Sequence, residues 1–157
     1  RQNIGDRYRN VVGIFMNQIL QGQPMTIFGD GQQTRAFTSI DDVAPVMADA
    51  LDTPRAWNEV FNIGADEPHR LTELAVSVAR AMGVTPDVRH LPARSEVTHA
   101  HSAHEKLRRT FGQRPHTSLD PGLRAMAAWV REHGARVGPT FDGLEVTKNL
   151  PPAWLTE

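Results

Sequence analysis

The sequence contains no cysteine, only one tyrosine, and no apolar run long enough to cross a bilayer. Without cysteine it can form neither a disulfide nor a thiolate metal site, which suits a reducing compartment, and we expect a cytoplasmic protein. Neither sign of charge dominates, because 17 Lys and Arg stand against 18 Asp and Glu, for a formal net charge of -1. This balance predicts no nucleic-acid partner and no membrane partner, so any anion site must be local.

The composition is that of an ordinary globular protein, with 39% hydrophobic and 22% charged residues among 157. Helix-like and strand-like patterns alternate along the chain and predict an α/β or α+β fold. We expect helices over 10–21, 41–51, 71–82, 103–111 and 118–133, with caps at Asn10, at Asp41 or Asp42, and at Ser118. We expect strands over 24–28, 34–40, 60–64 and 87–92, and an irregular, proline-containing tail over 134–157.

The strongest local signal is the glycine turn Gly29-Asp30-Gly31, followed closely by Thr34 and Arg35. Glycines let the backbone pass close to a ligand, and an arginine offers a planar fork of donors to phosphate oxygens. Spacing alone favours the simpler interpretation, a hairpin turn with a surface arginine.

A longer run decides between these interpretations. Residues 22–43 resemble the signature G-x-P-x-x-I-x-G-D-G-x-Q-x-R-D-F-x-x-V-D-D of extended short-chain dehydrogenases/reductases that act on nucleotide sugars. Further matches follow in the family's order: 61–64 resembles its F-N-I-G strand, 71–75 the next helix, 92–97 the R-x-G-E-V segment and 118–123 the closing helix. The resemblance covers residues 1–133.

The resemblance implies the C-terminal part of an extended Rossmann-type α/β fold, with the last parallel-sheet elements and a small α+β substrate-binding region. In the family, a preceding Rossmann half binds NAD and the C-terminal part holds a nucleoside diphosphate. By position, Arg35 and Arg94 would contact the diphosphate, and two separated arginines can grip it from both sides. The resemblance also assigns Asn3 to substrate binding, because Asn3 lies in the stretch that in the family follows a Tyr-Gly-Pro loop near the cofactor. It further implies a pocket for the nucleobase and ribose. That pocket would contain Pro24, Met25 and Phe28, for which plain strand packing is an equal alternative.

Two motifs of the family are missing from the sequence. It has no Gly-x-x-Gly-x-x-Gly loop to seat the NAD pyrophosphate, and its one tyrosine, Tyr8, is followed four residues later by Val12 rather than by lysine. We therefore expect a truncated chain that is inactive alone, and we name no catalytic residue.

The parent function that the resemblance implies is UDP-glucose 4-epimerase-like epimerisation of a nucleotide sugar with bound NAD, in a homodimer. A dehydratase, decarboxylase or reductase of the same fold is the alternative within the enzyme class. A non-catalytic module that binds a nucleotide sugar or a protein is the alternative outside it.

Three histidines close in sequence, His99, His101 and His104, lie near Glu96 and Glu105 and raise the question of a metal site. Their spacing lacks the i, i+4 step of helical metal ligands. We therefore expect a solvated loop that leads into a helix, and no metal.

Overall fold

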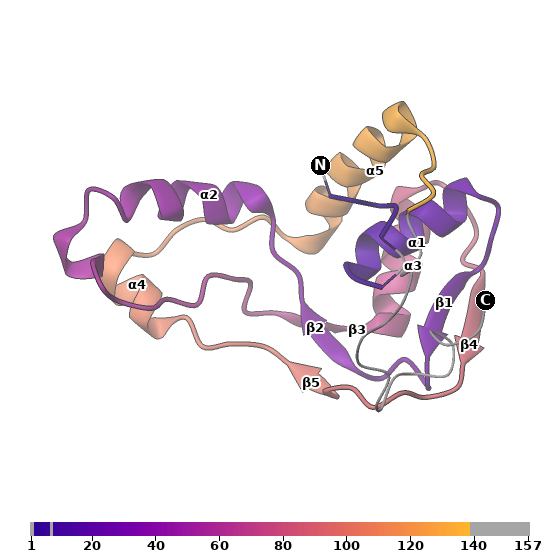
Figure 1. Ribbon diagram of the computed structural model, residues 1–157, viewed down its shortest axis with the longest axis horizontal. Helices are drawn as coiled ribbons and strands as arrows, with labels where there is room; N and C mark the ends of the chain where they lie inside the picture. The colour runs from indigo at the N-terminus through magenta and orange to yellow at the C-terminus, as the bar shows by residue number, and fades with distance from the viewer. Residues whose placement is uncertain (1, 7, 139–157) are drawn as a thin grey trace.

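The computed structural model describes residues 2–6 and 8–138, and its elements form two lobes joined by a small sheet (Figure 1). One lobe, which we call the bundle lobe, holds the helices α1 (Val11–Leu20), α3 (Leu71–Ala81) and α5 (Leu119–His133) with the strands β1 (Met25–Phe28) and β4 (Val88–Leu91). The other, the α2–α4 lobe, comprises residues 37–66 and 101–117 and holds α2 (Ile40–Asp49), a 3-10 turn (Pro54–Ala56) and α4 (Glu105–Phe111).

The bundle lobe contains the hydrophobic core. Its three helices pack on one another and α1 and α3 pack on β1, which pairs in parallel with β4 from Met25 opposite Val88 to Phe28 opposite Leu91. Apolar residues at helical spacing supply the buried faces, as the sequence predicts. Phe15, Leu74 and Val130 are fully buried, and burying a side chain of this kind stabilises the fold by about 1.5–3 kcal/mol.

A three-stranded sheet lies between the two lobes, in the order β3-β2-β5. The central strand β2 (Thr34–Ala36) runs antiparallel to β3 (Pro68–Arg70) and parallel to β5 (His99–Ala100). Because β2 pairs with both neighbours, this sheet brings residues near 35, 69 and 99 side by side. It therefore holds the glycine turn against the segment that carries Arg94 and Glu96.

The α2–α4 lobe is held together mainly by polar contacts. Lys106 Nζ lies 2.6 Å from a carboxylate oxygen of Glu59, and Arg108 Nη1 lies 2.9 Å from a carboxylate oxygen of Asp66. Among the described residues of this lobe only two hydrophobic side chains, Val46 and Ala56, are buried. The lobe thus has almost no core of its own.

The five helices and two of the four strands, 24–28 and 87–92, lie where the sequence predicts them, but two strand predictions need correction. The predicted strand 60–64 has no regular secondary structure, and the predicted strand 34–40 ends at Ala36. The short strands β3 and β5 were not predicted, because their sequences are polar and their pairing depends on distant residues.

The caps also differ from those predicted. Ser39, not Asp41 or Asp42, caps α2 by accepting a hydrogen bond from the Asp41 N–H at 3.3 Å. Asn10 adopts a left-handed conformation, with φ of 68°, and neither Asn10 nor Ser118 makes a side-chain capping bond.

Of the predicted tail, residues 134–138 are irregular, and the remainder lies outside the described residues. Within the part of the chain that the structure describes, no helix is both long enough and apolar enough to cross a membrane.

Candidate nucleotide-sugar site

The glycine turn between β1 and β2 sets the geometry of the candidate site. Gly29 and Gly31 have φ of 71° and 76°, a region that side chains other than glycine rarely adopt. A Cβ on Gly31 would lie 2.7 Å from Thr72 Cγ2, so the turn also needs glycine for space. The buried Gln33 closes the turn, since its side-chain amide donates to the Phe28 carbonyl at 2.9 Å.

Arg35 follows this turn and is bound through both terminal nitrogens of its guanidinium. Nη1 donates to the carbonyls of Thr34 at 2.7 Å and Thr98 at 3.2 Å, and Nη2 donates to the carbonyl of Val97 at 2.7 Å. These bonds link β2 to residues 97–98, which lie just before β5. They fix the guanidinium at the edge of the turn.

Arg94 approaches the same place from the segment after β4. Its guanidinium carbon lies 4.2 Å from the centroid of the Phe28 ring, a cation–π arrangement. Glu96 joins the two arginines, because its Oε2 lies 3.3 Å from Nη2 of Arg35 and 3.4 Å from Nη2 of Arg94. Gln33 donates to the other carboxylate oxygen of Glu96 at 3.1 Å.

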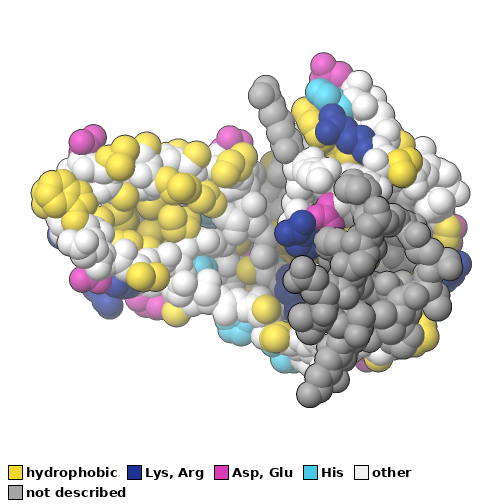
Figure 2. All heavy atoms as spheres, viewed as in Figure 1, with side chains coloured by type: hydrophobic (Ala, Val, Ile, Leu, Met, Phe, Trp, Pro, Cys, Tyr) yellow, Lys and Arg dark blue, Asp and Glu magenta, His cyan; other side chains and the backbone are white. Residues whose placement is uncertain are grey.

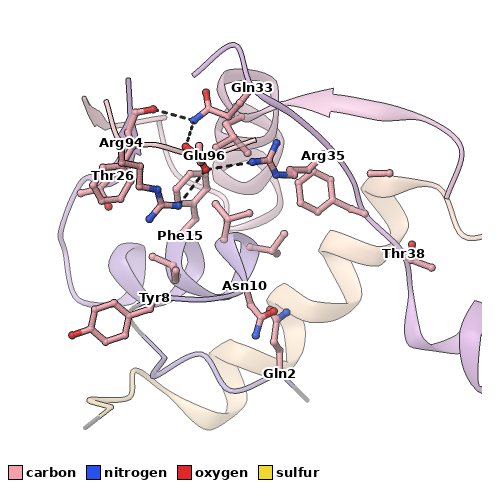
Figure 3. A pocket seen from close by; sticks show the side chains of 17 residues that line it. Gln2, Tyr8, Asn10, Phe15, Thr26, Gln33, Arg35, Thr38, Arg94 and Glu96 are labelled. Atoms are coloured by element: carbon pink, nitrogen blue, oxygen red, sulfur yellow. Dashed lines mark hydrogen bonds and ion pairs between the residues drawn. The ribbon is translucent and has the colours of Figure 1, made fainter. Parts of the chain in front are cut away.

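These side chains line a cavity of about 460 Å³, with Arg35 and Arg94 both directed toward Glu96 (Figure 3). The side chains of the two arginines and of Glu96 are all about three-quarters buried, so their charges are only partly screened by water. Among the described residues, two guanidinium groups and one carboxylate lie in the cavity beside the Phe28 ring. Guanidinium groups bind anions and an aromatic ring offers an apolar surface, so the cavity is suited to a small anion with an apolar group beside it.

Three of the six predicted binding residues, Arg35, Arg94 and Phe28, line this cavity. The other three do not. Met25 is 1% exposed and belongs to the core, as strand packing predicts, while Pro24 and Asn3 lie elsewhere. The Asn3 side chain accepts a hydrogen bond from the Gly5 N–H at 3.2 Å.

Three further side chains that were not predicted from the sequence also line the cavity: Gln33, Glu96 and Tyr8. Gln33 and Glu96 stand within the two matched family segments, which is the signal that could have found them. Nothing in the pattern around Tyr8 indicates a pocket.

The histidines next to the site do not converge. His99 Nδ1 is hydrogen-bonded to Thr34 Oγ1 at 2.9 Å, while His104 lies in the other lobe. Within the described part of the chain, no group of three or more His, Asp or Glu side chains could hold a metal ion.

His104 is buried rather than solvated, which corrects the sequence prediction. Its Nδ1 lies 2.7 Å from Asp66 Oδ1 and its Nε2 lies 2.9 Å from Ser102 Oγ. This order of contacts has the connectivity of a hydrolase triad, but the side chain of Asp66 is 67% exposed, whereas the acid of such a triad is buried. The hydrogen bond of His104 to Asp66 therefore connects the start of α4 to residue 66. The hydrogen bond from His104, assisted by the charge of Arg108, lowers the pKa of Asp66 below its ordinary value of 3.8.

Comparison with known proteins identifies the family. Residues 2–64 match the model of the NAD dependent epimerase/dehydratase family. A UDP-N-acetyl-alpha-D-glucosaminuronate decarboxylase of Bacillus cytotoxicus is 28% identical over an alignment of 134 residues, which covers 80% of this chain and 41% of that protein. The chain belongs to this family of extended short-chain dehydrogenases/reductases.

Two solved structures support the same assignment. The UDP-glucose 4-epimerase of Thermotoga maritima, solved with UDP-glucose, superposes with a TM-score of 0.74 at 29% identity, covering 82% of this chain and 42% of that one. The UDP-glucuronic acid 4-epimerase of Bacillus cereus, solved with UDP-glucuronic acid and NAD, has a TM-score of 0.72 at 28% identity, covering 79% and 40%. The chain thus spans about two fifths of the length of these relatives.

The residues present do not fit the pyrophosphate of NAD. That group needs a glycine-rich turn between a strand and the helix that follows. In the described part of the chain, the one strand that leads directly into a helix is β3, and its junction with α3 is Arg70-Leu71, without a glycine. The described residues therefore offer no seat for the NAD pyrophosphate.

Proposed function

We propose that this chain is the nucleotide-sugar-binding part of an NAD-dependent nucleotide-sugar epimerase of the UDP-glucose 4-epimerase kind. The observation that carries this proposal is the meeting of Arg35 and Arg94, 59 positions apart in the sequence, in one cavity beside the Phe28 ring. The activities of the relatives support the same conclusion, because two of them are epimerases and one is a decarboxylase, and all three act on UDP-sugars.

The side chains divide the work by chemistry. The two guanidinium groups would bind the diphosphate, since charge-assisted hydrogen bonds to phosphate oxygens are among the strongest polar contacts in proteins. Phe28 offers an apolar surface for the nucleoside, and the bonds of Arg35 to three backbone carbonyls keep its guanidinium oriented. Binding and orienting the nucleotide is the whole contribution of this chain.

NAD supplies the redox chemistry of the family by accepting and returning a hydride at a sugar carbon. This chain lacks the glycine-rich loop and the Tyr-x-x-x-Lys pair. We propose that a separate NAD-binding part completes the enzyme and that this chain has no activity alone.

Calorimetry on the full chain tests the proposal. UDP and UDP-glucose should bind, whereas free glucose should not. Arg94→Ala should weaken UDP binding by about 2 kcal/mol, which is about 30-fold, because a charged contact is lost. Arg124→Ala, on the exposed side of α5, is the matched control and should bind UDP normally.

Two results would refute this assignment. One is an equal affinity for UDP in Arg94→Ala and in the unaltered chain. The other is conversion of UDP-glucose to UDP-galactose by the chain alone with added NAD, which would show that the catalytic groups are present here.

Two alternatives follow from the same cavity. A dehydratase, decarboxylase or reductase would bind the same diphosphate. The similarity to the Bacillus cytotoxicus decarboxylase supports this alternative. A non-catalytic nucleotide-sugar-binding or protein-binding module is the second. The homodimer of the parent protein and its cytoplasmic location remain predictions.

A further inference from the structure

The chain turns back after α5 and runs to α1. The helix ends at Gly134, whose φ of 72° allows the change of direction. The rings of Trp129 and His133 stack with their centroids 4.4 Å apart, and the guanidinium carbon of Arg136 lies 5.6 Å from the centroid of the Trp129 ring. Figure 2 shows histidine and basic side chains beside hydrophobic ones over the end of α5. We call residues 134–138 the strap, which leads from α5 toward α1 in Figure 1.

Asn17 on α1 binds the strap through both polar atoms of its side-chain amide. Its Nδ2 donates to the Arg136 carbonyl at 2.8 Å, and its Oδ1 accepts from the Arg136 N–H at 2.9 Å. Gln21, at the end of the same helix, donates to the same carbonyl at 3.3 Å. Both backbone polar groups of Arg136 are thus satisfied by side chains of α1, which fixes the strap on this helix.

The far end of the strap contacts the N-terminal segment 2–6. A Cβ on the buried Gly5 would lie 3.2 Å from Gly138 N and 3.4 Å from Gly138 Cα, and a Cβ on Gly138 would overlap the Gly5 carbonyl oxygen. Glycine at both positions permits this close approach of two backbones. On its other side the segment packs against α1, where a Cβ on Gly13 would lie 2.8 Å from Gln2 Oε1. Segment 2–6 therefore lies between α1 and the strap.

The start of the chain supplies one wall of the candidate site. Five of its residues line the cavity: Gln2, Tyr8, Asn10, Val11 and Val12. Within the loop before α1, Asp6 accepts hydrogen bonds from the backbone N–H groups of Tyr8 at 2.9 Å and Arg9 at 3.1 Å, which fix the shape of this loop. The packing of segment 2–6 between α1 and the strap places the loop on the molecule.

We propose that the strap is a positioning element of the nucleotide-sugar cavity and that Asn17 is the positioning residue through which it acts. The inference rests on the proposed function. Figure 3 shows Gln2 and Tyr8 across the cavity from Arg35 and Arg94, so a displaced segment 2–6 would open the site. A wall that is already held in place need not be ordered by the ligand, which favours binding. The family resemblance covers residues 1–133, so the strap is not part of that pattern.

Thiol labelling tests the positioning without a ligand, because the chain has no cysteine and an introduced cysteine is unique. Gln2→Cys is labelled in the full chain, alone and combined with Asn17→Ala or with Gly138→Ala. Labelling should be at least about 5-fold faster in both combinations, because release of the strap exposes segment 2–6. Val76→Cys on α3, where the valine is 47% exposed, is the control and should keep its rate. Equal rates at position 2 with and without these changes would overturn the proposal.

Calorimetry with UDP-glucose on the full chain connects the strap to the site. Asn17→Ala, in the chain without an introduced cysteine, should weaken binding by about 5-fold, because strap and ligand then no longer stabilise the same wall. Asn62→Ala is the matched control, since it removes a bond of the same kind, from Nδ2 to the Ala103 carbonyl at 3.5 Å, in the α2–α4 lobe. This control should bind UDP-glucose normally. An unchanged affinity in Asn17→Ala would overturn the proposal even if labelling is faster.

The two measurements also separate this inference from the proposed function. UDP-glucose binding with equal labelling rates at position 2 refutes the strap as a positioning element and leaves the proposed function standing. Absence of UDP-glucose binding by the unaltered chain refutes the proposed function, and the labelling rates then decide alone whether the strap positions the cavity wall.

Discussion

Arg35 and Arg94 meet on a single oxygen of Glu96, at 3.3 Å and 3.4 Å. The three residues come from two segments that the β2–β5 pairing brings together. The carboxylate thus holds both guanidinium groups at the same cavity. The cavity side chains are held in place by one another, which reduces the entropy that the proposed binding of a nucleotide must overcome.

The role of Arg35 as an anchor can be separated from its charge. Arg35→Lys keeps the charge, but an ammonium group cannot reach three carbonyls and a carboxylate as a planar guanidinium does. We expect the free energy of unfolding to fall by about 1–2 kcal/mol in urea titrations. Arg124→Lys, at an exposed position, is the control. An equal stability of the two variants would mean that the Arg35 bonds contribute nothing to the fold.

The contribution of Glu96 should depend on salt. Glu96→Gln preserves the shape of the side chain but removes the carboxylate charge that both guanidinium groups contact. We expect the free energy of unfolding to fall by about 1 kcal/mol in low salt. The loss should shrink at 1 M NaCl because salt screens the attraction of that carboxylate for the two groups. Glu132→Gln, exposed on α5, should show neither effect, and a salt-independent loss would argue against the charge explanation.

The glycine turn should tolerate no side chain at position 31. Gly31→Ala places a Cβ 2.7 Å from Thr72 Cγ2 and 3.2 Å from Ile27 Cγ2, at a φ of 76°. We expect a loss of about 1–3 kcal/mol in thermal or chemical unfolding. Gly22→Ala is the matched control, since its φ is 68° but no atom lies within 4 Å of the added Cβ. The difference between the two variants measures the close packing alone, and equal losses would leave only backbone strain.

Acid should weaken the tie between α4 and Asp66. Because the folded pKa of Asp66 lies below 3.8, mainly through the hydrogen bond to His104, the ionised form is favoured in the folded protein. Its stabilising contribution is complete above the ordinary pKa and is lost as the pH falls through the lower, folded value. Asp66→Asn should therefore be less stable than the unaltered chain at pH 6, and the gap should narrow at pH 3. Urea titrations at the two pH values measure it, and a constant gap would contradict the prediction.

The parts of the fold that sequence could predict are those decided by local patterns. The helices around Phe15, Leu74 and Val130 carry an apolar stripe at helical spacing, and that stripe faces the core. The strand near Ile27 is a short, mostly apolar run that ends at a glycine turn, and the strand near Val88 is bounded by Pro86 and Pro92. The pairing of Arg35 with His69 and Ala100 could not be predicted, because it joins three segments far apart in the chain.

The candidate site likewise has features that the sequence could predict and features that it could not. Arg35 and Arg94 could be predicted as binding residues because each stands in a family motif, but their meeting on Glu96 depends on the three-dimensional arrangement. For Met25 the sequence left a ligand pocket and plain strand packing as equal alternatives, and alternation along β1 places its side chain in the core. His104 was expected in solvent, and no local pattern indicates its burial against Asp66.

The scarcity of buried apolar side chains in the α2–α4 lobe also determines which part of the molecule unfolds first. With Val46 and Ala56 as the only hydrophobic residues buried there among those described, this lobe and the bundle lobe should behave as separate cooperative units of very unequal stability. Amide protons of α2 would exchange with solvent far sooner than those of α3, and a protease would cut first around Arg55.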